Sequence, residues 1–153
     1  MTPLNRRAFL KKSAVAGVGF GILANEASAR SLFRAKPVRV GIIGLDTSHS
    51  VAFTKLLNDP EVAADLAGYR VVAAYPHGSA DIESSVSRIP GYIEDVKKLG
   101  VEITSSIKEL LEKTDVILLE TNDGRLHLEQ ARQVIKAKKP MFVDKPVAAS
   151  LKD

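Results

Sequence analysis

Five short apolar segments alternate along the chain with segments whose apolar residues recur at helical spacing. The apolar segments are too short for helices, so each predicts a strand of a mostly buried sheet. Regular alternation of strand and helix is typical of a doubly wound parallel sheet with right-handed crossovers. The sequence therefore predicts an α/β, Rossmann-like fold, with strands at residues 38–44, 69–75, 101–104, 115–119 and 141–143.

Capping and turn residues predict where the helices lie. Thr47 or Ser48 suits the start of a helix that runs to about Asn58, and Ser106 with Glu109 forms a capping box. Proline suits the first turn of a helix and glycine follows the last. The remaining expectations are a further helical turn at 61–66 ending at Gly68, a loop at 79–87, a helix from Pro90 to Gly100, and a helix at 126–138.

The first strand ends in a glycine turn that resembles a dinucleotide fingerprint only in part. That fingerprint has three glycines, but here Gly44 holds the first place, Asp46 the second, and His49 lies at or near the third. Gly44 permits a sharp turn, and the free N–H groups that follow at Thr47 and Ser48 attract an anion. The alternative is that Asp46 caps the helix, His49 is a surface residue, and no phosphate binds.

Ionisable residues gather in the turns that follow the strands. Ligands of an open α/β sheet bind beyond the carboxyl ends of the strands, and all three histidines, His49, His77 and His127, fall in such turns. The second turn lacks the acidic residue that holds the ribose of NAD, so His77 is a candidate contact and an ordinary loop is the alternative. The three histidines with nearby carboxylates also allow a metal site. Because histidines in separate loops are usually unlinked, we expect no metal.

Lys145 is the strongest single candidate for chemistry. It lies between Asp144 and Pro146 at the end of the last predicted strand. A lysine in this position can donate a hydrogen bond to a substrate hydroxyl and shift its pKa, and Pro146 fixes the backbone beside it. The alternative is a solvated lysine.

Residues 1–29 have the composition of an export signal. A basic head with Arg6, Arg7 and Lys11 is followed by a short apolar segment, 14–24, and by the small-residue cleavage pattern 27–29. The run Arg-Arg-x-Phe-Leu-Lys resembles the twin-arginine (Tat) signal. It implies the Tat translocase as a partner and a periplasmic or otherwise exported protein. An ordinary Sec signal and an uncleaved anchor are the alternatives. Residues 30–37 read as a lead-in.

The distribution of charge and the absence of cysteine exclude several functions. The formal net charge is +4. Four basic residues and one acidic residue fall within 1–29, which leaves the remainder near +1, so we expect no nucleic-acid partner. The chain has no cysteine, which excludes disulfides, cysteine-bound zinc and thiol catalysis.

Three segments together resemble the Gfo/Idh/MocA oxidoreductases. They are Val40-Gly-Ile-Ile-Gly44, the turn Thr121 to His127, and Lys139-Pro-Met-Phe-Val-Asp-Lys-Pro146, whose end is similar to the family's Glu-Lys-Pro. The resemblance covers residues 38–153 and implies an NADP or NAD cofactor, with Lys145 near the nicotinamide and the reacting hydroxyl. Thr121, Asn122 and His127 match the family's Thr-Pro-Asn-x-x-His turn loosely. With the turns above, the expected cofactor-binding residues are Gly44, Asp46, Thr47, Ser48, His49, His77, Thr121, Asn122, His127, Asp144, Lys145 and Pro146.

The resemblance also implies what lies outside this sequence. The family's second domain supplies most of the substrate site, so we expect 38–153 to be an incomplete Rossmann-like domain, from a truncated form of a longer protein. The expected function is the nucleotide-binding half of an exported oxidoreductase that transfers hydride to or from a sugar, polyol or related small molecule. Such a fragment is unlikely to be active alone, and homo-oligomers would form through the second domain. The alternative is a non-catalytic ligand-binding protein with an altered cofactor turn.

Overall fold

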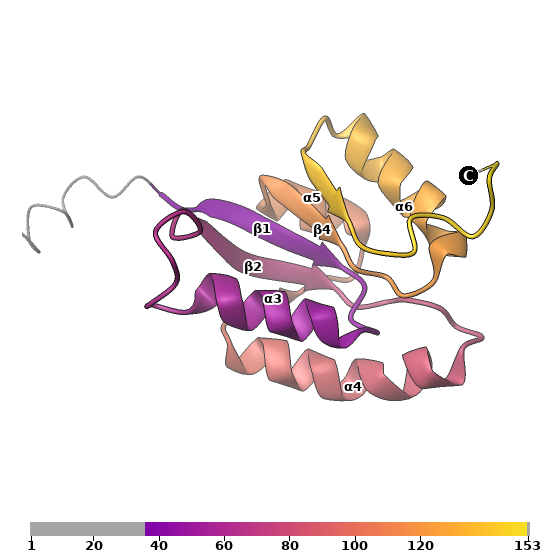
Figure 1. Cartoon of the computed structure of the whole chain (residues 1–153), viewed down its shortest axis with the longest axis horizontal. Coiled ribbons are helices and arrows are strands. Elements are labelled where there is room, and N and C mark those ends of the chain that lie inside the picture. Colours follow the sequence, from indigo (N-terminus) through magenta and orange to yellow (C-terminus); the bar gives the residue numbers. More distant parts are fainter. Residues whose placement is uncertain (1–35, 153) are drawn as a thin grey trace, which may run out of the picture. The chain divides into compact units, whose positions relative to one another are not determined.

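The computed structural model describes residues 36–152, which form one parallel sheet between two layers of helices (Figure 1). The five strands pair in the order β3-β2-β1-β4-β5, and every pair is parallel. This confirms the predicted α/β fold. The strands are β1 (Val38–Ile43), β2 (Tyr69–Tyr75), β3 (Glu102–Ile103), β4 (Val116–Leu119) and β5 (Met141–Val143).

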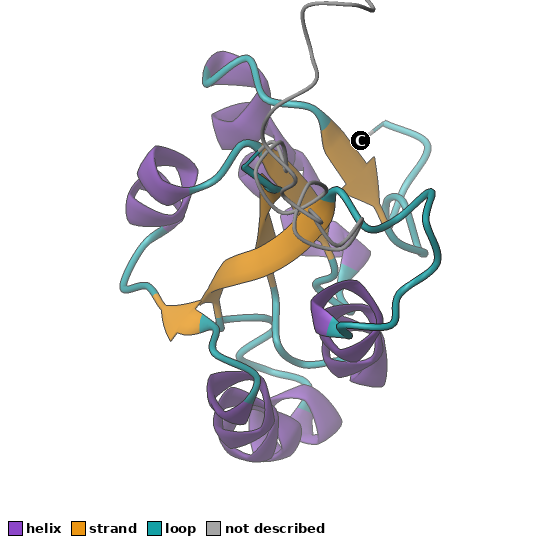
Figure 2. Ribbon diagram, turned by 90° about the vertical axis from the view of Figure 1, so that its left-hand side faces the viewer, coloured by secondary structure: helices purple, strands orange, loops and turns teal. Residues whose placement is uncertain are grey.

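Helices cover both faces of the sheet, which explains why the strands are apolar on both sides (Figures 1 and 2). Helices α3 (Ser48–Asn58) and α4 (Glu83–Lys98) cover one face, and α5 (Ile107–Lys113) and α6 (Gly124–Lys136) cover the other. Alternate residues of the strands therefore enter two separate cores. The first core contains Val40, Ile42, Val51, Val71 and Val96, and the second contains Ile43, Ala73, Leu110, Ile117, Leu119 and Val134.

The strand order places a ligand crevice between β1 and β4. The chain builds β1, β2 and β3 outward in one direction and then crosses back to place β4 on the other side of β1. The connections that leave β1 and β4 consequently run to opposite faces of the sheet. A crevice opens beyond the carboxyl ends of the strands at such a switch point, and ligands of open α/β sheets bind there.

The capping signals in the sequence correspond to real caps. Thr47 precedes α3, and its side-chain oxygen accepts from the N–H of His49 at 3.4 Å. Ser106 precedes α5 and accepts from the N–H of Glu109 at 3.1 Å. Gly100 follows α4 with φ +82, the left-handed conformation that glycine adopts without strain. Asp46 does not cap α3, because Thr47 does.

Helix α4 begins earlier than the sequence predicted. A helix was expected from Pro90 and a loop at 79–87, but α4 starts at Glu83 and Pro90 lies inside it. Ser85, Tyr92 and Val96 fall on one inward face at helical spacing, so the face continues through the proline. Pro90 only removes one main-chain hydrogen bond from the helix. The serines of the first turn give no apolar pattern, so the sequence did not indicate a helix there.

Two other boundaries differ from the prediction. Residues 61–66 do not form a helix: one helical hydrogen bond joins the N–H of Ala67 to the carbonyl of Ala63, and Asp59 accepts from the N–H of Glu61 and starts a separate turn before it. Helix α6 spans Gly124–Lys136, where 126–138 was expected, because Asp123 caps it and Lys138 leaves the helix with φ +56.

The expected export signal, 1–29, and most of the lead-in, 30–37, lie outside the residues that the structure describes. Within 36–152, no helix is both long enough and apolar enough to cross a membrane.

Gly44 is the glycine on which the first turn depends. It has φ +92, and a Cβ added there would lie 2.5 Å from the main-chain nitrogen of Thr121. A side chain at position 44 would therefore be strained by its backbone and would also push apart the turns that follow β1 and β4.

We expect Gly44→Ala to lower the free energy of unfolding by roughly 2 kcal/mol or more, because strain and collision add. Urea denaturation measures the change. Gly91→Ala is the matched control: a Cβ there meets nothing within 4 Å, and alanine favours the helix interior by up to about 1 kcal/mol. A Gly44→Ala protein as stable as the parent would contradict the packing described here.

Candidate functional site

The residues singled out in the sequence lie along the carboxyl edge of the sheet or in the helix that follows it. Gly44 to His49 link β1 to α3, His77 follows β2, Thr121 and Asn122 follow β4, His127 lies in α6, and Asp144 to Pro146 follow β5. Their placement follows from the parallel order of the strands, since all the strands end at the same edge. The structure does not bring them all into one cluster.

Asp46 is turned into the protein. Its side chain is fully buried, and Oδ1 accepts from the main-chain N–H of Asn122 at 3.1 Å. Gly78 makes room for it, because a Cβ on Gly78 would lie 2.1 Å from Asp46 Oδ2. Asp46 thus joins the turns after β1, β2 and β4, and its charge does not face the start of α3.

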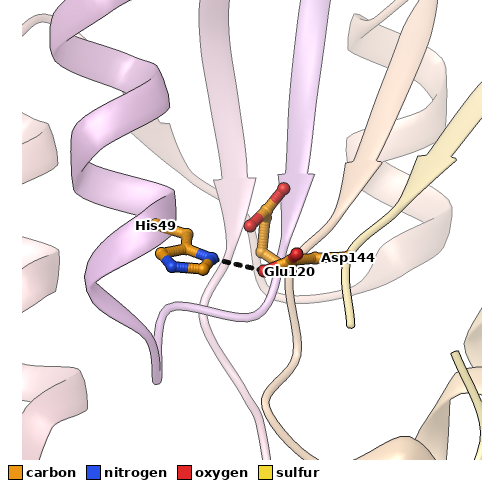
Figure 3. Close-up of side chains that lie close together, drawn as sticks. All are labelled: His49, Glu120 and Asp144. Atoms are coloured by element: carbon orange, nitrogen blue, oxygen red, sulfur yellow. Dashed lines mark hydrogen bonds and ion pairs between the residues drawn. The ribbon is translucent and has the colours of Figure 1, made fainter. Parts of the chain in front are cut away.

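His49, Glu120 and Asp144 converge at the switch point (Figure 3). Nδ1 of His49 lies 2.5 Å from Oδ2 of Asp144, which links the first turn of α3 to the end of β5. One ligand atom from each of the three residues lies within 4.8 Å of the others. Glu120 comes directly after β4 and is 1% exposed, and neither of its carboxylate oxygens has a hydrogen-bond partner among the residues described.

The environment of this trio shifts two carboxyl groups in opposite directions. Burial, with the nearby charge of Asp144, raises the pKa of Glu120 to about 7. Burial acts the same way on Asp144, but hydrogen bonds from His49 and from the N–H of Lys145 outweigh it and hold the pKa of Asp144 below its ordinary value. Carboxyl groups with separated pKa values are typical of functional sites, and also of structural networks.

Lys145 and His127 occupy opposite environments. Lys145 is exposed, and its ammonium group lies within electrostatic reach of both Glu120 and Asp144. His127 is 2% exposed, and its ring nitrogens face the carbonyl oxygens of Thr121 at 2.6 Å and Val147 at 3.1 Å. Its ring therefore connects the turn after β4 to the segment after Pro146. The bridge fixes the main chain at Val147, two residues after Lys145.

An arginine network that the sequence did not single out closes one side of the crevice. Arg125 in the first turn of α6 donates to both carboxylates, Asp81 at 2.7 Å and Asp123 at 2.6 Å, and to Ser79 at 3.3 Å. These contacts hold the pKa of Asp123 to about 2 and lower the pKa of Asp81. The network ties the loop after β2 to the start of α6. Asp81, the nearest carboxylate after β2, is consequently engaged by the protein itself.

His77 is exposed and lies apart from the trio. Its ring packs edge-on against Tyr75, with centroids 5.2 Å apart. It borders a shallow pocket of about 340 Å³ between the loop after β2 and the start of α4. The three histidines do not form a common ligand set in the part of the chain described, because only His49 belongs to a group with metal-ligand spacing.

Two observations fit the edge of the sheet to a dinucleotide. Among the buried side-chain atoms of residues 36–152 that lack a partner, both carboxylate oxygens of Glu120 and Oγ1 of Thr121 lie in the turn that follows β4. Ribose hydroxyls and a carboxamide are donors that suit such acceptors. Helix α3 also begins at this edge of the sheet, and the N–H groups of a helix N-terminus favour an anion such as a pyrophosphate. Fold and site together define a nucleotide-binding α/β domain.

Comparison with known proteins identifies the class of domain more closely. Residues 38–153 match the oxidoreductase family with the NAD-binding Rossmann fold, the Gfo/Idh/MocA family, and the chain belongs to that family. This confirms the expected family, and the expected cofactor class, NAD or NADP, is the family's own. No curated protein matches the sequence significantly.

Solved structures share the fold at low sequence identity. A dehydrogenase from Clostridium difficile is 22% identical with a TM-score of 0.54, over 76% of this chain and 33% of that one. UDP-N-acetylglucosamine 3-dehydrogenase from Acidithiobacillus ferrooxidans is 14% identical with a TM-score of 0.56, and the match covers 77% of this chain and 32% of that one. An inositol dehydrogenase homologue complexed with NAD+ from Azotobacter vinelandii is 19% identical with a TM-score of 0.52, and the match covers 77% of this chain and 29% of that one. The chain thus spans about a third of the length of these relatives.

The raised pKa of Glu120 makes stability depend on pH. A carboxyl group with a folded-state pKa of about 7 and an ordinary value of 4.5 holds its proton in the folded protein while the unfolded chain loses it. Between these pH values the free energy of unfolding falls as pH rises, by about 3 kcal/mol from this group. The carboxyl groups with lowered pKa titrate below this window.

We expect Glu120→Gln to remove this dependence, because an amide of the same shape does not ionise. Chemical denaturation of both proteins at pH 5 and pH 8, in the presence of a chelator, measures the difference. The free energy of unfolding of the variant minus that of the parent should be larger at pH 8 than at pH 5. Equal pH dependence in the two proteins would show that Glu120 is ionised in the folded state at both values.

We expect Arg125→Gln to loosen the loop after β2, because Asp81 and Asp123 lose their common partner. Hydrogen exchange of the amides at 79–82 should be faster in the variant. Arg132→Gln, at an exposed position of the same helix, is the matched control and should leave that exchange unchanged. Unchanged exchange in the Arg125 variant would show that the loop is held by other contacts.

Proposed function

We propose that this chain is the nucleotide-binding part of an exported NAD(P)-dependent oxidoreductase that acts on a sugar, polyol or related small molecule. Membership in the NAD-binding oxidoreductase family carries the proposal. The polar residues at the switch point between β1 and β4 support it, because the fold predicts the ligand crevice at that place. A UDP-N-acetylglucosamine 3-dehydrogenase and a homologue of inositol dehydrogenase share the fold.

The dinucleotide would lie across the carboxyl ends of β1 and β4. The first N–H groups of α3, after Thr47, would face its pyrophosphate, and the buried acceptors of Glu120 and Thr121 would face its hydroxyl or carboxamide donors. A bound nicotinamide would supply hydride transfer to or from the carbon that carries the substrate hydroxyl.

Lys145 would position and polarise the substrate hydroxyl. Its exposed ammonium group can donate to the substrate oxygen and stabilise the negative charge that the oxygen carries after its proton passes to water and before the hydride leaves, or as a hydride arrives in the reverse direction. Two neighbours support this role. Asp144 accepts from the N–H of Lys145 at 2.8 Å, and His127 holds the carbonyl of Val147 two residues further on. The lysine thus extends from a segment that is fixed on both sides.

A second candidate function is a non-catalytic ligand-binding protein that kept the fold. The observation that favours it is the turn after Gly44, where Asp46 and His49 stand in or near places that the fingerprint gives to glycine. Both residues are engaged in contacts of the protein itself. If these contacts close the turn to a pyrophosphate, glycine at both positions should create an affinity for the cofactor that the parent lacks.

Export through the Tat pathway is part of the proposal. The run of Arg6, Arg7, Phe9, Leu10 and Lys11 supports it, and the pathway carries folded proteins, which suits a protein that must hold a cofactor before translocation. The protein would act in the periplasm or beyond. Replacing both arginines by lysine should retain the protein in the cytoplasm, which cell fractionation would show.

We expect the protein, as its gene encodes it, to bind NADH or NADPH in isothermal titration calorimetry. Lys145→Met should bind the cofactor with nearly the parent affinity, because the lysine is proposed to act on the substrate. It should lose roughly 10²-fold or more in turnover of whichever sugar or polyol the parent oxidises. Lys152→Met, at another exposed lysine, is the control and should keep full activity.

Binding of neither cofactor by the folded protein would overturn the proposal. If the Asp46→Gly, His49→Gly double variant then binds where the parent does not, the non-catalytic alternative is supported. If the parent binds the cofactor tightly, that alternative fails.

A further inference from the structure

We propose that His49, Glu120 and Asp144 form a binding site for a divalent transition-metal cation, Zn²⁺ or Mn²⁺, at the switch point of the sheet. This goes beyond the proposed function, which requires a nucleotide and a substrate but no metal. It also differs from a site made of the three histidines, since it uses one histidine and two carboxylates from three separate elements.

The geometry supplies three ligands from a rigid frame. His49 lies in the first turn of α3, Glu120 directly follows β4, and Asp144 directly follows β5, and their ligand atoms lie within 4.8 Å of one another (Figure 3). Ligand bonds to zinc are about 2.0 to 2.2 Å long, so a cation can reach all three with side-chain movements on the order of 1 Å. Nδ1 of His49 and Oδ2 of Asp144 move apart as the cation enters between them.

Glu120 provides a second and independent observation. It is 1% exposed, and both carboxylate oxygens lack partners within residues 36–152. An unpaired buried carboxylate is costly unless a proton or a cation compensates it. The exposed ammonium of Lys145 is near, but it makes no ion pair within 4.0 Å with Glu120 or Asp144 among the described salt bridges. Glu120 is thus buried beside His49 and Asp144, with one carboxylate oxygen within 4.8 Å of their ligand atoms and no lysine or arginine paired with it among residues 36–152.

The donor set indicates the kind of cation. Imidazole favours zinc and its neighbours among the transition metals, whereas carboxylates also suit manganese. Three protein ligands leave at least one position open, which is typical of catalytic sites and not of closed structural ones. The side chain of His49 is 40% exposed, so water or a substrate oxygen can reach that open position from the crevice.

A shared proton is the competing explanation for the trio. A proton held between Glu120 and Asp144, with His49 on the other side of Asp144, would also remove the unfavourable charge. The two explanations differ for one substitution. Glu120→Gln supplies an N–H in place of the proton and preserves such a network, but it removes a metal ligand.

The test is calorimetric titration of the untagged, chelator-treated protein with ZnCl₂ and, separately, MnCl₂. We expect one equivalent to bind, with at least about tenfold weaker binding in each of His49→Gln, Glu120→Gln and Asp144→Asn. His77→Gln, an exposed histidine at the same edge of the sheet, is the matched control and should bind as the parent does. Circular dichroism and thermal unfolding of each variant establish that it is folded.

Two results would overturn the proposal. The first is that the parent protein binds neither cation. The second is that binding survives in the folded Glu120→Gln and His49→Gln proteins, which would place the cation elsewhere in the protein. Titration of NADH into the chelator-treated protein tests the proposed nucleotide-binding function separately from the metal site. If the protein binds the cofactor without a metal, the proposed function stands whatever the outcome for the cation.

Discussion

The contact between Gly44 and Thr121 is the constraint on which the edge of the sheet depends. The two turns meet so closely that a single added methyl group would overlap the main chain of Thr121. This contact brings the start of α3 next to the end of β4, although their sequences lie more than 70 residues apart. The hydrogen bond from the N–H of Asn122 to Asp46 and the approach of His49 to Glu120 both follow from it. The arrangement of residues at the switch point thus depends on glycine at position 44, where no side chain fits.

Burying acidic groups at this edge has a cost that the structure does not fully offset. Asp46 and Glu120 are both buried, and each keeps at least one carboxylate oxygen without a partner within residues 36–152. Asp81, in the loop after β2, and Asp123, just before α6, show the opposite solution, since Arg125 pairs with both. Hydrogen bonds to a guanidinium stabilise the ionised acids, whereas burial destabilises the ionised Glu120. The carboxylates of Asp81 and Asp123 are therefore already paired, whereas the carboxylate of Glu120 can still accept donors or a positive charge from a ligand.

The sequence predicted the fold more completely than the site, for a physical reason. Apolar runs such as Val116 to Leu119 and caps such as Thr47 report local preferences that burial reinforces, so strands and helices were found nearly in place. The main error, the start of α4, arose where Ser85 occupies the inward face in place of an apolar residue. Glu120 and Arg125 were missed because their roles depend on which strand ends lie side by side. A carboxylate directly after a fully apolar strand is the signal that pointed to Glu120, since the end of a central strand is buried.

The departures from the glycine fingerprint have a structural role. In a fingerprint of three glycines, the turn is free of side chains and a pyrophosphate approaches the backbone. Here Asp46 fastens the turn to Asn122 and fits against Gly78, and His49 reaches across to Asp144 at the end of β5. The two replacements therefore link β1 to the segments after β2, β4 and β5. Because His49 pairs with the residue that immediately precedes Lys145, the first turn and the candidate catalytic lysine are joined by a direct contact and are best understood as parts of one site.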